Sequence, residues 1–147
     1  MVTKFALIFG IIYAIIGVLG FIPGLVTPPE MTGGMTNEMA VEMGHGRLFG
    51  LFAVNFLHNL VHLGVGVWGI MASRQGLSAS VFFAQVNAVL FAILALLGLI
   101  PFTNTLFGLV PLYGHDVWLH ILTALAAGYF GFGPPARPVT ETKRAPR

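Results

Sequence analysis

Polar side chains capable of chemistry recur at helical spacing in an otherwise apolar part of the chain. Four of them are spaced i, i+3, i+4 and i+7, which predicts one shared helix face: Asn55, His58, Asn59 and His62. Further along, Asp116 and His120 are spaced i, i+4 and would also share a face. Imidazole and carboxylate groups ligate transition metals, and imidazole is an axial ligand of haem iron. The two spacings therefore predict an HxxxH motif facing a DxxxH motif.

Three kinds of role are open for these side chains. In a cofactor site, His58, His62 and His120 would bind haem, a chlorophyll-type tetrapyrrole or, with Asp116, a transition metal. In a structural role, the polar groups would form interhelical hydrogen bonds that fix the packing of a bundle. In a transport role, they would form a proton or metal-ion path, since ionisable residues within membranes often mark such paths.

Further polar residues are expected to join this group. Counted from the ends of their apolar segments, Asn87 and Tyr13 reach a depth comparable to that of His62, and we predict them as hydrogen-bond partners of the polar face. Asp116, at the start of its segment, is expected near the outer surface of the membrane. Because unpaired polar groups are costly in lipid, this face must point into a bundle.

The composition predicts that the helices carrying these residues cross a membrane. Of 147 residues, 56% are hydrophobic and 8% are charged, and the mean hydropathy is +0.88. A soluble domain has about a quarter of its residues charged. Apolar segments of spanning length predict four helices at about 5–22, 48–72, 79–100 and 115–132. We expect an all-α integral membrane four-helix bundle.

The basic residues predict the orientation of the bundle. Six of the seven fall on one side of this layout: Lys4, Arg74, Arg137, Lys143, Arg144 and Arg147. Because positive residues are enriched in cytoplasmic segments, both termini are predicted to be cytoplasmic, with the 73–78 turn on the same side. We divide the chain into a transmembrane domain, 1–133, and a basic, proline-rich tail, 134–147, expected to touch anionic lipid.

The sequence also contains two related halves. Residues 14–23 resemble 92–101 at an offset of 78, and the LFGL segment at 48–51 recurs at 106–109, an offset of 58. The second offset places His58 over Asp116 and His62 over His120. The pattern predicts two duplicated helical hairpins in parallel orientation. Small residues at spacing four are expected to allow close helix packing: Gly10 and Ala14, Ala88 and Ala92, and Ala124 and Gly128.

A methionine-rich segment lies between the first two predicted spans. Methionine occurs at every fourth position, followed by a histidine: Met31, Met35, Met39, Met43 and His45. Thioethers select Cu(I), so an outer copper-binding loop formed by Met35, Met39, Met43 and His45 is one interpretation. Methionine is also a common filler of apolar gaps, so packing against the bundle or the membrane interface is the other.

Several functions are not supported by the residues present. The absence of cysteine excludes disulfides and thiolate sites, and the sequence has no nucleophile elbow or phosphate-binding loop, so we expect no enzyme activity. The pI of about 9.4 reflects a net charge of only +2 without a basic stripe, so we expect lipid as a partner and no nucleic acid. In the structural role, the protein would be a structural or accessory subunit of a larger membrane complex without a ligand, and other membrane subunits would be its partners.

Two segments resemble a bacterial family of small four-span membrane proteins of unknown function. They are GRLFGLFAVNFLHNLVHL at 46–63 and DVWLH at 116–120, which carry the signatures GLFxVNxxHNLVHL and DxxLH. The resemblance extends from the second to the fourth predicted helix and implies a multi-pass protein of the bacterial cytoplasmic membrane. It implies that the polar residues of both motifs are signature positions, and it supplies no activity.

Overall fold

The computed structural model describes residues 1–27 and 46–136, which are mostly helical. The long helices are α1 (Val2–Leu19), α3 (Phe56–Gln75), α4 (Leu77–Leu99) and α5 (His115–Phe132). Short 3-10 helices follow at η1 (Pro23–Leu25) and η2 (Pro134–Ala136). The bounds predicted for the last helix are confirmed, and those of the first and third differ by three residues or fewer.

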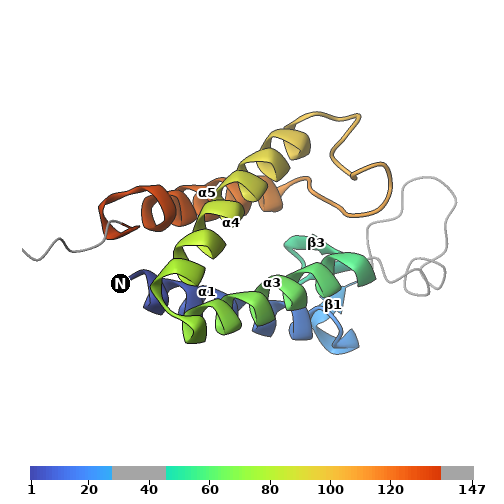
Figure 1. Cartoon of the computed structure of the whole chain (residues 1–147). Helices are drawn as coiled ribbons and strands as arrows, with labels where there is room; N and C mark the ends of the chain where they lie inside the picture. The colour runs from blue at the N-terminus through green and yellow to red at the C-terminus, as the bar shows by residue number, and fades with distance from the viewer. Residues whose placement is uncertain (28–45, 137–147) are drawn as a thin grey trace, which may run out of the picture.

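The helices pack as two pairs (Figure 1). Helix α1 lies along α3, and α4 lies along α5, with smaller contacts of α4 against α1 and α3. One residue, Gly76, joins α3 to α4, where a turn of six residues was predicted, and its φ of 104° is a conformation that suits glycine. A cluster of buried side chains lies where α1, α3 and α4 meet: Ala6, Phe9, Tyr13, Val65, Ala72, Phe83 and Phe91.

Three of these helices are long and apolar enough to cross a membrane: α1, α3 and α4. Their outward faces carry exposed leucine, isoleucine, valine and phenylalanine side chains, as expected for helices in contact with lipid. The coarse prediction of a helical membrane protein is therefore confirmed by the described residues.

The second predicted helix begins eight residues later than expected. Residues 46–54 form β2 (Gly46–Leu48) and β3 (Phe52–Val54), which pair antiparallel with each other, and β1 (Val26–Thr27) pairs with β2. The prediction that this helix begins at Leu48 was therefore wrong, although the described residues are mostly helical as predicted. A short apolar stretch is compatible with a strand as well as with a helix. The turn between β2 and β3 has a positive φ of 72° at Gly50, a conformation that suits glycine.

Both LFGL segments form tight turns with corresponding backbone hydrogen bonds. In each turn, two amides donate to the carbonyl three residues earlier. The pairs are Gly50 to Arg47 and Leu51 to Leu48 in the first turn, and Gly108 to Thr105 and Leu109 to Leu106 in the second. Positive φ angles occur at Phe49 and Gly50 in the first turn and at Leu106, Phe107 and Gly108 in the second. The two turns thus share left-handed conformations at two equivalent positions.

Candidate functional site

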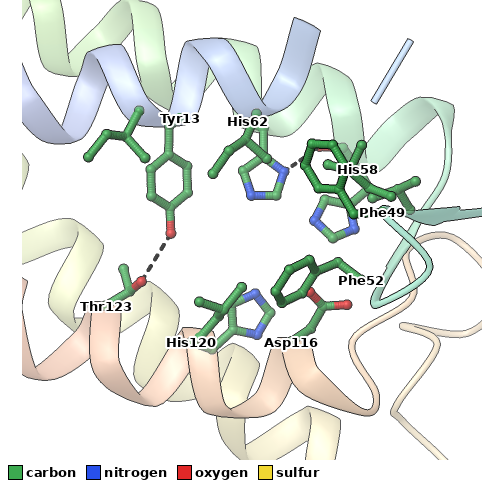
Figure 2. A pocket seen from close by; sticks show the side chains of 13 residues that line it. Tyr13, Phe49, Phe52, His58, His62, Asp116, His120 and Thr123 are labelled. Atoms are coloured by element: carbon green, nitrogen blue, oxygen red, sulfur yellow. Dashed lines mark hydrogen bonds between the residues drawn. The ribbon is translucent and has the colours of Figure 1, made fainter. Parts of the chain in front are cut away.

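A cavity of about 290 Å³ lies between α1, α3, α5 and the turn that joins β2 to β3 (Figure 2). Polar groups from three helices line it: Tyr13, His58, His62, Asp116, His120 and Thr123. The remaining lining is apolar: Ile12, Ile16, Leu48, Phe49, Phe52, Val54 and Leu119. The structure therefore brings the two predicted motifs, HxxxH and DxxxH, to the same cavity.

Helix α3 supplies two imidazoles to one wall. The rings of His58 and His62 are stacked, with centroids 4.4 Å apart and an interplanar angle of 13°. Nδ1 of His62 lies 3.2 Å from the carbonyl oxygen of His58. Because a carbonyl oxygen can only accept, Nδ1 of His62 is the donor, and in the neutral ring Nε2 carries a lone pair.

Helix α5 supplies the opposite wall. Asp116 and His120 are one turn apart and are 3% and 5% exposed, respectively. Asp116 is in the first turn of α5, where it was predicted, and its side chain is buried and lines the cavity together with Phe52. The hairpin that replaces the start of the predicted helix lines this end of the cavity.

Three of these cavity residues have a buried polar atom without a hydrogen-bond partner among the described residues. The atoms are Nδ1 of His58, Oδ2 of Asp116 and Nδ1 of His120. Most buried polar side-chain atoms in proteins do have a partner, so each exception calls for an explanation. Three exceptions around one cavity indicate a place where polar interactions with another chemical group are available.

A bridge between α1 and α5 bounds the cavity on a third side. The hydroxyl of Tyr13 lies 3.2 Å from Oγ1 of Thr123, and its ring centroid is 5.0 Å from that of His62. Phe91 continues this aromatic contact, 5.4 Å from Tyr13 and 5.4 Å from His120. Thr123 was not predicted as a site residue, although a hydroxyl three residues after His120 in an apolar helix indicated it.

A second cavity of about 220 Å³ lies against the same histidines. It shares Tyr13, His58, His62 and His120 with the first cavity. The rest of its lining is apolar: Val61, Val65, Leu90, Phe91, Leu94, Leu106, Val110 and Leu112. The imidazoles therefore border two cavities, one with a carboxyl group and one with an otherwise apolar wall.

The asparagines of the predicted polar face have a different role. Asn55 is the N-cap of α3, so it does not lie on the helix as predicted; its Oδ1 accepts from the amide of His58, and its Nδ2 donates to the carbonyl of Leu109. Asn59 donates to the carbonyl of Gly20, 2.8 Å away, at the end of α1. Asparagine side chains thus connect α3 to other segments, as the structural interpretation predicted.

The partners predicted for Asn87 and Tyr13 were wrong. Asn87 is fully buried, but its Nδ2 donates to the carbonyl of Phe83 in the same helix, while its Oδ1 has no partner among the described residues. Tyr13 hydrogen-bonds Thr123 rather than the asparagine and histidine face. Both side chains lie deep in the bundle as expected, but a carbonyl one turn back satisfies the Asn87 amide locally.

Replacing Asn55 by alanine should lower the free energy of unfolding by about 1 kcal/mol, the usual effect of losing an N-cap. The variant also leaves the Leu109 carbonyl without its donor. Asn55→Asp is the matched control, since aspartate keeps the capping oxygen and lacks the Nδ2 donor. Denaturant unfolding in detergent measures both, and an alanine variant as stable as the wild type would contradict this role.

The described part of the chain has no preformed group of side chains that could ligate a bare metal ion. Within residues 1–27 and 46–136, no three His, Asp or Glu side chains are grouped closely enough to hold one metal ion. The candidate copper segment, Met35 to His45, lies outside the described residues, as does the tail beyond Ala136.

The fold and the cavity define a helical membrane protein with a buried cluster of histidines and one aspartate. The chain matches the family described as a domain of unknown function, DUF4383, over residues 3–133. It belongs to this family, and the predicted resemblance to an uncharacterised family is confirmed. No curated protein and no solved structure matches the chain.

Proposed function

We propose that this is a non-enzymatic integral membrane protein that binds a cofactor in the cavity between α3 and α5. The observation that carries the proposal is the set of three buried, unpartnered polar atoms, on His58, Asp116 and His120, around one cavity. Burying a polar group without a partner costs about 1–3 kcal/mol. A ligand that interacts with these groups would offset that cost.

The histidines are poorly suited to a purely structural role. Within the described residues, none of the three cavity imidazoles hydrogen-bonds another helix, and the bond made by His62 joins it to its own helix. Side-chain hydrogen bonds between helices come instead from Asn59, Ser80, Gln85 and the Tyr13–Thr123 pair. Because other side chains connect the helices, we assign the histidines a binding role.

The candidate ligands are haem, a chlorophyll-type tetrapyrrole and a transition metal. Each of His58, His62 and His120 would supply a nitrogen ligand. Because no three of these side chains and Asp116 are grouped around one point, a bare metal ion would be bound by no more than two of them as they stand. Imidazoles of this kind are usually oriented by a hydrogen bond from the second ring nitrogen to a carbonyl or carboxylate. The bond from His62 to the carbonyl of His58 has this form.

We propose four spans, with α5 as the fourth and both termini in the cytoplasm of a bacterium. Helix α5 has 18 residues, about the minimum for crossing the hydrocarbon core. The distribution of basic residues, Lys4 and Arg74 on one side and Arg47 on the other, supports the orientation. Lipid is then the partner of the exposed apolar faces.

We also propose that the protein arose by duplication of a helical hairpin. Under the two sequence offsets, α1 corresponds to α4 and α3 to α5, and the pairs α1–α3 and α4–α5 make the largest contacts. Equivalent close approaches support this: Gly20 faces Asn59, and Gly98 faces Val117. The corresponding hydrogen bonds of the two LFGL turns are a second, independent support.

Purification of the full-length protein from its own membranes tests the cofactor proposal. We expect either a tetrapyrrole absorption band or a stoichiometric metal, lost in His62→Ala because that ring faces the cavity. His115→Ala is the matched control, since His115 is exposed at the start of α5. A colourless, metal-free wild-type preparation would contradict the proposal.

A further inference from the structure

His62 and His120 form a facing pair at equivalent positions of the two halves. The offset of 58 that aligns the LFGL turns also places His62 over His120. The first ring comes from α3 and the second from α5, on opposite sides of the cavity (Figure 2). A ligand held by both would therefore lie between the two pairs of helices.

The protonation of His62 limits what it can bind. Its Nδ1 donates to the carbonyl of His58, and the other ring nitrogen faces the cavity (Figure 2). In the neutral ring that nitrogen offers a lone pair, so it can ligate a metal or accept a hydrogen bond. It cannot donate to the carbonyl groups of a quinone-type ligand.

The position of the two cavities indicates the shape of the ligand. Both border His58, His62 and His120, one on the side of Phe49 and Phe52 and the other beside the leucines of α4. Each cavity, at about 290 and 220 Å³, is smaller than the about 300–1,000 Å³ of most ligand sites, so a large ligand would need both. A flat ligand centred between the imidazoles could extend into both.

From these observations we propose that the site binds a metal tetrapyrrole of the haem type, with His62 and His120 as its axial ligands. This inference rests on the proposed function, of which it names the ligand class and the ligating pair. A bare metal ion requires three or four protein ligands around one point. A tetrapyrrole metal requires only one or two axial ligands, which suits donors on two facing walls.

The apolar surroundings suit the rim of such a ring. Phe49, Phe52 and Phe91 lie in the linings, and apolar lining with few polar groups is typical of cofactor sites. Ile12 and Leu119, which also line the first cavity, are 49% and 41% exposed on α1 and α5. A lipid-soluble ligand would reach the cavity past these two side chains from the membrane.

Titration of the purified, detergent-solubilised full-length protein with haemin tests this inference. We expect a saturable, equimolar shift of the Soret band and the spectrum of six-coordinate, low-spin haem. His62→Gln and His120→Gln should each lose the six-coordinate spectrum. Exogenous imidazole should restore it in His62→Ala, whereas His115→Gln should behave as the wild type.

Three results would overturn the inference. The first is a six-coordinate spectrum that survives either glutamine substitution. The second is loss of that spectrum in His115→Gln to the same extent as in the His62 and His120 variants. The third is failure of the wild type to bind haemin. Equilibrium dialysis of the same wild-type and His62→Gln samples against Zn²⁺, Cu²⁺ and Ni²⁺ then separates the two proposals. His62-dependent metal binding without haem binding overturns the tetrapyrrole and supports the cofactor site. Binding of neither haemin nor metal overturns the haem-type inference and, together with a colourless, metal-free native preparation, the cofactor proposal as well.

Discussion

Gly66→Ala is expected to destabilise the protein by about 1–3 kcal/mol, because an added methyl group would overpack the contact between α1 and α3. A Cβ at Gly66 would lie 2.5 Å from the backbone nitrogen and 2.7 Å from the Cα of Ala14. Both are backbone atoms, so no side-chain rotation relieves the clash and the helices must separate. Helix α1 approaches α3 just as closely one turn away, since a Cβ at Gly10 would lie 2.7 Å from the carbonyl oxygen of Gly66.

Gly64 on the same helix provides the matched control. A Cβ at Gly64 meets nothing within 4 Å. Alanine is favoured over glycine inside a helix by up to about 1 kcal/mol, so Gly64→Ala should be neutral or stabilising. Thermal unfolding of both variants in detergent measures the difference. Equal stability of the two would show that α1 and α3 do not cross at Gly66.

The apolar spans were predictable because the membrane imposes their length and composition. The segments that became α1 and α4 are long apolar runs, and helical hydrogen bonding is required wherever the backbone crosses lipid. The contact of Gly10 with α3 was also predictable, since small residues allow close approach of membrane helices. These features depend on local composition and hardly at all on the rest of the chain.

The start of α3 was mispredicted although the sequence contained a usable signal. Asparagine is among the preferred N-cap residues, and Asn55 caps the amide of His58 three residues later. An N-cap at this position excludes residues 48–54 from the helix. Hydropathy alone extended the helix over them, because residues 48–54, LFGLFAV, contain no charged or polar side chain.

The residues of the site were predictable, but their environments were not. The spacing identified His58, His62, Asp116 and His120, and all four line one cavity. The burial of Asp116 depends on the β2–β3 hairpin, which lies more than 60 residues earlier in the sequence. The packing of three helices likewise determines which polar atoms remain without a hydrogen-bond partner. Sequence spacing therefore could not distinguish the asparagines that connect segments from the histidines that line the cavity.

That distinction predicts opposite responses to leucine. In ligand-free protein, His120→Leu should raise the free energy of unfolding by about 1–3 kcal/mol, the cost of burying a polar group without a partner. His120 is 5% exposed and its Nδ1 has no partner among the described residues. Asn59→Leu should instead lower stability by about 1 kcal/mol, because it removes the hydrogen bond to the carbonyl of Gly20.

Unfolding of both leucine variants in detergent, after removal of bound haem and metal, measures these changes. The stabilised His120→Leu protein should also fail to bind haemin, because leucine has no atom to ligate the iron. Stability and ligand binding would then change in opposite directions at one residue, as expected where a binding site is maintained at a cost to the fold. A destabilised His120→Leu, similar to Asn59→Leu, would show that the imidazole supports the bundle, and would remove the main argument for a cofactor in this cavity.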